Sequence, residues 1–276
     1  MDVIINAQHT VVPEPSIRLT EHGHFYHHLL SCLNYSDKYP PVADLLGRYY
    51  GLEGRWLVVS PVHWEATHND AMMIATSHEL HLSEEESRQW FSAFAEFSAE
   101  ERMQAYYCDA HTWLLRYDDK PEIIAKPAHS LLHQSLLPHL QALDETFYWQ
   151  RFITESQMFF NTHPLNDKRP DCSINGLWLW GSGRLNTSVC IPVICGDSYL
   201  IEIANHLSSD VRLYQPSQSL PKNAILLIDC LDANELHHLQ VQLCHTTVHW
   251  YWNNGVYCTR PKKWLSRLWG SISYAN

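Results

Sequence analysis

Apolar and polar residues follow two patterns along this chain. In some short runs they alternate, and in other segments apolar residues recur three and four positions apart. The first pattern is typical of strands and the second indicates one face of a helix. Strands are predicted over residues 1–7, 56–59, 71–75, 112–117, 176–180, 188–194, 199–203, 224–229, 245–252 and 256–259. Helices are predicted over residues 20–33, 41–50, 83–97, 138–161 and 234–243. Because the two kinds of element alternate, we expect a mixed α/β fold, with helices flanking a mixed sheet.

Local signals mark where several of these elements begin or turn. Thr20 is suited to cap the first helix, and Pro40-Pro41 is suited to start the second. Ser83 and Glu86 have the spacing of a capping box, in which each side chain bonds the backbone N–H of the other residue. Asn253-Asn254-Gly255 lies between two apolar runs and predicts a hairpin.

The length of 276 residues suits one large domain, or two lobes that share a core. Residues 122–133 are the least regular stretch, and a turn signal, Asp118-Asp119-Lys120-Pro121, precedes them. We therefore expect residues 1–276 to form a single domain; if it has two lobes, the seam between them is expected near residues 118–134.

Charge and composition narrow the classes of partner. The formal net charge of −11 argues against nucleic acid, because binding there depends on Lys and Arg that neutralise phosphates. No apolar run approaches the roughly 18 residues of a membrane span, and the N-terminus lacks the features of a signal peptide. The eight Cys contain no C-x-x-C pair. We therefore expect a cytoplasmic protein with reduced thiols and no membrane insertion.

Aromatic residues are abundant, with 11 Trp and 14 Tyr. Such amphipathic rings are favoured at interfaces and in grooves. The alternative is that they fill a large core. The sequence leaves both interpretations open.

One block, residues 163–183, combines polar and aromatic side chains with glycines. Arg169 has the geometry to grip a carboxylate or phosphate with two hydrogen bonds, and Gly181 and Gly183 would let backbone approach a ligand. The candidate ligand-binding residues are His163, Asn166, Arg169, Asn175, Trp178, Trp180, Gly181 and Gly183. The alternative is structural: a His-Pro-x-Asn stretch after a helix shapes a turn, and Trp178 and Trp180 form a packing shelf on one face of a strand.

This block resembles one in archaeal-type, cofactor-independent phosphoglycerate mutases and in a bacterial group of RpfE-type, mutase-like proteins. The spacings H-P-x-N-x-x-R and N-x-x-W-L-W-G-x-G both match. A weaker likeness to the bacterial group extends to Pro61-Val62-His63, the helix start at 82–85 and Leu227-Ile228-Asp229. The resemblance implies a remnant of the alkaline-phosphatase architecture, whose members transfer phosphoryl groups through a Ser or Thr nucleophile beside two divalent metals.

The chemistry that the resemblance implies has few matching residues here. The family pattern has Asp-Gly after the first strand, whereas this chain has Asn6-Ala7-Gln8, and Gly196-Asp197 is followed by Ser198 instead of His. Asp229 and Asp232 end a strand at a plausible place but lack a His at matching spacing. The sequence therefore predicts no catalytic residues, no metal site and no cofactor.

Residues 260–269 form a basic and aromatic patch in an otherwise acidic protein. Its candidate partner-binding residues are Arg260, Lys263, Trp264, Arg267 and Trp269. As a helix, this segment would bury one apolar face. It could dock onto its own domain, bind a partner protein, as such mixtures of charge and Trp favour, or lie on a membrane surface.

Two main hypotheses for the function follow. In the first, the protein is a non-catalytic relative of the mutases that acts through protein–protein interaction or self-association. Its role would be that of a regulator or an adaptor or assembly subunit, with a coupling complex of a bacterial secretion system as one concrete setting. In the second, it is a metal-dependent phosphomutase or phosphatase acting on a small phosphorylated acid. A non-catalytic sensor of such a metabolite lies between them.

Overall fold

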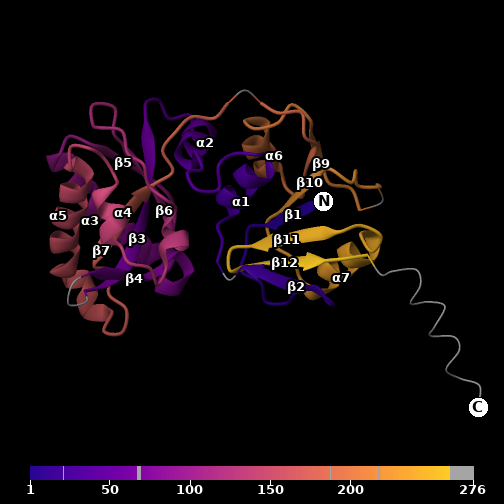
Figure 1. The fold of residues 1–276 in the computed structure, drawn as a ribbon, viewed down its shortest axis with the longest axis horizontal. Helices are drawn as coiled ribbons and strands as arrows, with labels where there is room; N and C mark the ends of the chain where they lie inside the picture. The colour runs from indigo at the N-terminus through magenta and orange to yellow at the C-terminus, as the bar shows by residue number, and fades with distance from the viewer. Residues whose placement is uncertain (21, 67–69, 187, 217, 262–276) are drawn as a thin grey trace, which may run out of the picture. The chain divides into compact units, whose positions relative to one another are not determined.

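The computed structural model describes residues 1–20, 22–66, 70–186, 188–216 and 218–261. The chain forms two compact units (Figure 1). Unit 1 comprises Met1–Leu33 and Thr187–Asn276, and unit 2 comprises Asn34–Asn186. Unit 1 is therefore assembled from both ends of the chain, and residues 118–134, where the sequence suggested a seam, lie inside unit 2. Among the described residues, no helix combines the length and hydrophobicity needed to cross a bilayer.

A seven-stranded sheet forms the centre of unit 1. Its strands are β1 (Asp2–Ile5), β2 (Ile17–Thr20), β8 (Val193–Cys195), β9 (Val211–Leu213), β10 (Ile225–Ile228), β11 (Val248–Trp252) and β12 (Gly255–Thr259). They run in the order β2-β12-β11-β1-β10-β8-β9. The five strands from β11 to β9 pair in parallel, whereas β12 and β2 are antiparallel. The carboxyl ends of the parallel strands therefore meet along one edge.

Three helices pack on this sheet: α1 (Phe25–Cys32), α6 (Ser198–Asn205) and α7 (Ala233–Gln242). Val3 and Ile5 of β1 share a core with Leu236 and Leu239 of α7. Side chains alternate between the two faces of a strand, so Ile4 points to the opposite face of the sheet. Because β1 is apolar on both faces, it can lie buried at the centre of a parallel sheet.

An antiparallel sheet forms the centre of unit 2. Its strands are β3 (Trp56–Ala66), β4 (Ala71–Thr76), β5 (Gln104–Asp109), β6 (Thr112–Arg116) and β7 (Gly176–Trp180). The long strand β3 pairs with β4, β6 and β7, and β6 pairs with β5. The helices are α2 (Val42–Tyr49), α3 (Glu84–Glu100), α4 (Leu137–Gln141) and α5 (Tyr148–Asn161), with short 3-10 turns η1 (Ser77–Leu80), η2 (Ala128–Leu131) and η3 (Pro164–Lys168).

Stacked aromatic rings hold α3 and α5 to each other and to the sheet of unit 2. Trp90 of α3 stacks on Phe160 of α5 at 5.3 Å between ring centroids, and Phe94 stacks on Trp113 of β6 at 5.6 Å. All nine described Trp are buried. The abundance of Trp in the described residues therefore serves the two cores.

The predicted mixed α/β class is confirmed, and so are most of the predicted elements. The prediction of a strand over residues 199–203 is wrong, since α6 occupies this segment. Its β-branched residues favour a strand, but Leu200, Ile203 and Ala204 have helical spacing and all three are buried. The segment 138–161 holds two helices instead of one, and strands β2, β5 and β9 were not predicted. Thr20 ends β2 instead of capping α1, whose N-cap is His24.

The predicted helix start at Ser83 is confirmed, because the Ser83 hydroxyl accepts a hydrogen bond from the backbone N–H of Glu86 at 3.2 Å. Only this half of the predicted capping box forms, since the Glu86 side chain bonds Arg169 instead of the Ser83 backbone. The Glu86 carboxylate forms an ion pair with Arg169 at 2.8 Å. This cap therefore also links the start of α3 to the segment that precedes β7.

Two histidines meet where η1 faces the turn between β5 and β6. The ring centroids of His78 and His111 lie 4.8 Å apart. Burial lowers the pKa of both imidazoles, and the charge of His78 is a further cause that brings the pKa of His111 to about 4. Glu84 opposes this shift at His111 only in part. The folded protein therefore favours the neutral form of both rings.

We predict that this pair makes stability fall as pH drops. Both pKa values lie below the ordinary value of 6.5, so the unfolded chain binds more protons between about pH 6.5 and pH 4. The stability that the two neutral imidazoles contribute is fully present above this window and is lost as the pH falls through it. Urea denaturation across these pH values should show a shallower loss for His111→Gln than for the unmodified protein. His238→Gln, on the exposed surface of α7, should leave the slope unchanged; equal slopes for all three proteins would contradict the assignment.

Candidate functional site

The carboxyl edge of the parallel strands in unit 1 is where the fold brings polar side chains together. Asn6 follows β1, Asp229 follows β10, and Asp197 follows β8 at the N-cap position of α6. In open α/β sheets, ligands bind outside the carboxyl ends of the strands. This edge is therefore the candidate site of unit 1.

Three of the side chains at this edge bond to one another. The Asn6 amide donates to Asp229 Oδ1 at 3.3 Å and to the Tyr199 hydroxyl at 3.4 Å. Tyr199, from the first turn of α6, donates its hydroxyl to the same carboxylate oxygen. Burial raises the pKa of Tyr199, and the hydrogen bond to Asp229 and the nearby charges of Asp229 and Asp197 raise it further. The hydroxyl therefore stays protonated and acts as a donor.

This arrangement differs from a site for divalent metals. A cation at this position needs converging carboxylates and imidazoles, whereas Asn6 offers a neutral amide whose nitrogen points to Asp229. Among the described residues, no group of three or more His, Cys, Asp and Glu side chains has the geometry of a metal site. The sequence indicated Asn6 and Asp229 only as residues that follow two separate strands. It gave no indication of Tyr199, because a strand was predicted there.

The residues of the 163–183 block lie in unit 2, where their polar groups bond to backbone. Asn175 reaches a bulge in β3: its Oδ1 accepts from the backbone N–H of Trp64 and its Nδ2 donates to the Trp64 carbonyl, both at 2.8 Å. Asn166 bonds the Ile174 backbone in the same reciprocal way, at 2.8 and 2.9 Å, and also donates to the Phe160 carbonyl. Each amide replaces backbone partners that an irregular segment lacks.

The guanidinium of Arg169 also forms its hydrogen bonds within unit 2. Its guanidinium donates to the Cys172 carbonyl at 2.8 Å, to Glu86 at 2.8 Å and to the Leu80 carbonyl. The side chain is only 11% exposed. The guanidinium therefore links η1, α3 and the segment before β7, and its charge is balanced by Glu86.

The remaining residues of the block pack or shape the backbone. The indole nitrogens of Trp178 and Trp180 donate to the Lys126 carbonyl at 2.8 Å and to Ser60 Oγ at 2.9 Å. Gly181 has a φ of +78°, and a Cβ there would lie 3.0 Å from Val58. Gly183 has a φ of +120°. The ring of His163 accepts from the Leu165 N–H at 3.3 Å and thereby begins η3.

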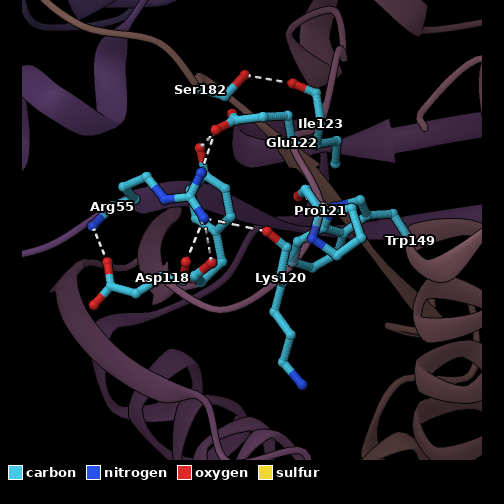
Figure 2. A network of polar contacts seen from close by, with 9 residues as sticks. Arg55, Asp118, Lys120, Pro121, Glu122, Ile123, Trp149 and Ser182 are labelled. Atoms are coloured by element: carbon cyan, nitrogen blue, oxygen red, sulfur yellow. Dashed lines mark hydrogen bonds and ion pairs between the residues drawn. The ribbon is translucent and has the colours of Figure 1, made fainter. Parts of the chain in front are cut away.

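Figure 2 shows a polar network that the sequence did not reveal, centred on Arg55 at the start of β3. The Arg55 guanidinium donates to the carbonyls of Tyr117, Asp118 and Lys120 and forms an ion pair with Glu122. Trp149 and Ser182 then donate to the carbonyls of Pro121 and Ile123, at 2.9 and 2.7 Å. Side chains from three parts of unit 2 thus hold the irregular segment 117–123.

A polar pocket of about 580 Å³ lies beside this network. Its charged lining residues are Asp44, Arg48, Arg55, Asp118, Glu122 and Arg184. Arg48 pairs with Asp44 at 2.8 Å, and Arg55 pairs with Glu122. Burial and the charge of Glu122 raise the pKa of Tyr117, which also lines the pocket, to about 12. Equal numbers of cations and carboxylates line the pocket, so it has no strong preference for an anion.

The surroundings of several polar side chains outside these clusters bear on their chemical reactivity. Burial, with the neighbouring Asp109, raises the pKa of the Cys108 thiol, which disfavours a reactive thiolate. His249 of β11 contacts Asp2 at 3.2 Å. In the basic patch, Arg260 is exposed, whereas Lys263, Trp264, Arg267 and Trp269 lie outside the described residues.

Comparisons with known proteins yield one distant structural likeness. No family model matches the chain, and the search of curated proteins finds no match. The structure is similar to that of a cofactor-independent phosphoglycerate mutase from Thermoplasma acidophilum DSM 1728, with 10% sequence identity and a TM-score of 0.35 over 93% of this chain and 88% of the other. A likeness of this degree does not establish shared chemistry.

We predict that Asn175→Asp destabilises unit 2 by about 2–3 kcal/mol, because a buried amide donor is lost and a carboxylate then faces the Trp64 carbonyl. Urea denaturation measures this loss. The matched control, Asn161→Asp at the exposed end of α5, should change stability by less than about 0.5 kcal/mol. Equal effects at the two positions would show that the Asn175 bonds contribute nothing.

At the edge of unit 1, we predict that Asn6→Asp destabilises the protein by about 1–2 kcal/mol at neutral pH, since two carboxylates then face each other. The paired carboxyls share a raised pKa, so the loss should shrink as pH falls and one of them is protonated. Thermal melts at neutral and acid pH test this. A pH-independent loss would contradict the predicted charge repulsion.

Proposed function

We propose that this protein is a non-catalytic, phosphoglycerate-mutase-like protein that acts by binding other proteins, as a regulator or as an adaptor or assembly subunit. A coupling complex of a bacterial secretion system is one setting that would suit it. The proposal is supported chiefly by the edge cluster of unit 1, in which Asn6 and Tyr199 both donate to Asp229.

Both hydrogen bonds reach Oδ1 of Asp229, and their donors are a neutral amide and a neutral hydroxyl. A site for divalent metals instead needs several carboxylates and imidazoles that converge on the cation. The bonds join the ends of β1 and β10 to the start of α6, and a rigid edge of this kind suits a surface that binds another protein.

The 163–183 block supports the same proposal. Arg169, the best candidate for gripping a phosphate, has its donors directed to Glu86 and to two carbonyls. Binding of a phosphorylated substrate by this block would require free donors. Protein interfaces favour Trp and Arg as hot-spot residues, and the sequence of residues 260–269 contains two of each.

The proposal predicts no turnover of phosphoglycerates or phosphate esters by the unmodified protein with added Mn²⁺ or Zn²⁺. Steady-state assays and elemental analysis of the purified protein measure this directly. In native cells, affinity purification should recover a stable partner, and the Asp229→Asn variant should retain that partner equally well.

The main alternative is a metal-dependent phosphomutase or phosphatase. Turnover that Arg169→Ala abolishes, or two tightly bound divalent metals per chain, would establish it and end the present proposal. A saturable increase in melting temperature with phosphoglycerate, without turnover, would instead indicate a sensor of this metabolite.

A further inference from the structure

The outward face of α5 in unit 2 carries large exposed side chains. Phe147, at the N-cap of the helix, is 60% exposed, and Met158, near its other end, is 69% exposed. Arg151 and Glu155 lie between them, with 61% and 46% of their side chains exposed. Residues three and four positions apart are neighbours on a helix surface. These four side chains therefore form one row, which we call the α5 stripe.

The opposite face of α5 holds the helix in unit 2. Phe152 and Phe160 are buried there and contact two rings of α3, Phe97 and Trp90, at 5.4 and 5.3 Å between centroids. Figure 1 shows α5 beside α3 at the margin of unit 2. The α5 stripe takes no part in this packing, yet Phe, Met and Arg are residue types that are enriched where proteins contact one another. Its composition therefore indicates an interface.

The turn before α5 presents the Phe147 ring in a fixed position. Phe147 has a φ of +57°, in the left-handed region that bulky residues rarely adopt. The Asp144 carboxylate holds this turn, because it accepts hydrogen bonds from the backbone N–H groups of Tyr148 and Trp149 at 3.2 and 2.9 Å. A side chain on such a rigid turn loses little conformational freedom when a partner binds, which favours binding.

An open hollow of about 890 Å³ lies beside Phe147, lined by Gln141 at the end of α4 and by the first turns of α5. A Met side chain suits such a place, because it adapts to irregular gaps and its sulfur makes favourable contacts with aromatic rings. Met158 lies 11 positions after Phe147, which is about 16 Å along the helix axis. It is therefore too far away to fill the hollow of its own chain.

The α5 stripe is complementary to itself when two copies meet with their helices antiparallel. The midpoint between Phe147 and Met158 lies between positions 152 and 153, and the midpoint between Arg151 and Glu155 is position 153. One two-fold axis at this point places Phe147 opposite Met158 and also Arg151 opposite Glu155. Each contact in a two-fold interface occurs twice, so the two copies form two ion pairs and two contacts between ring and sulfur.

The guanidinium of Arg151 can accept a second carboxylate. Within one chain it lies 3.5 Å from Glu155 and 3.8 Å from Glu101, and both distances exceed those of ordinary hydrogen bonds. A guanidinium has five N–H donors, so it can bond a carboxylate of a second copy. Such pairs matter because the net charge of −11 otherwise opposes the approach of two copies.

We propose that this protein forms a two-fold dimer through antiparallel packing of α5. Met158 of each copy enters the hollow beside Phe147 of the other copy, and Arg151 of each copy pairs with Glu155 of the other. This inference does not rest on the proposed function, because an enzyme could form the same dimer as an adaptor does.

Sedimentation velocity of the full-length chain over a dilution series tests the proposal. The unmodified protein should show an equilibrium between monomer and dimer. Phe147→Asn should weaken dimerisation at least roughly tenfold, because it removes an anchoring ring of the interface. Asn adopts the left-handed conformation more readily than other side chains do, so the turn is kept. An unchanged circular-dichroism spectrum of this variant shows that the fold is intact.

An exchange of charges tests the antiparallel arrangement. Arg151→Glu and Glu155→Arg, each studied alone, should both weaken dimerisation, because like charges then meet across the two-fold axis. An equimolar mixture of the two variants should dimerise again, since opposite charges face each other in the mixed dimer. Arg88→Glu on α3 is the matched control, because Arg88 is also 61% exposed and also pairs with a Glu four positions away. It should leave dimerisation unchanged.

Three results would overturn the proposal. A chain that stays monomeric throughout the dilution series would show that the α5 stripe does not bind a second copy and would leave it to a different protein. A dimer that Phe147→Asn leaves unchanged would place the interface elsewhere on the molecule. A mixture of the two charge variants that stays monomeric would contradict the antiparallel two-fold contact.

Discussion

Hydrogen bonds from side chains to backbone hold the irregular parts of unit 2, and the reciprocal pair between Asn175 and Trp64 is the one on which the most depends. At this point β3 has a bulge, so its backbone groups fall out of register with β4. The Asn175 amide supplies both a donor and an acceptor there. The same residue leads directly into β7, which pairs with β3. The bulge and the entry to β7 are thus fixed by one side chain.

Other side chains of unit 2 also bond the backbone carbonyls of irregular segments. Arg55, Trp149 and Ser182 satisfy the carbonyls of segment 117–123, and Arg169 satisfies those of Leu80 and Cys172. An unpaired buried backbone group costs roughly as much as a lost hydrogen bond, so loops without regular structure need such partners. Arg169, which the sequence suggested as a ligand-binding residue, instead bonds backbone groups of these loops.

Unit 1 uses polar side chains differently. Its loops leave a parallel sheet at one edge, where Asn6, Tyr199 and Asp229 meet because β1 and β10 end there and α6 begins there. In open α/β sheets, ligands bind at this edge. The three side chains bond to one another, and they therefore join the ends of β1 and β10 to the start of α6.

The sequence by itself determined the mixed α/β class, the position of most elements and the Ser83 helix start, because these follow from local periodicity and capping. It also identified Asn6 and Asp229 as ends of strands. Only the tertiary structure decided that Tyr199 joins them, since the helix at 198–205 forms against β8 and β9 where β-branched residues favour a strand. It alone placed Asn175 on the β3 bulge and Arg55 on segment 117–122. Those partners lie 62 to 111 residues apart, and no local pattern specifies which distant backbone groups a side chain will meet.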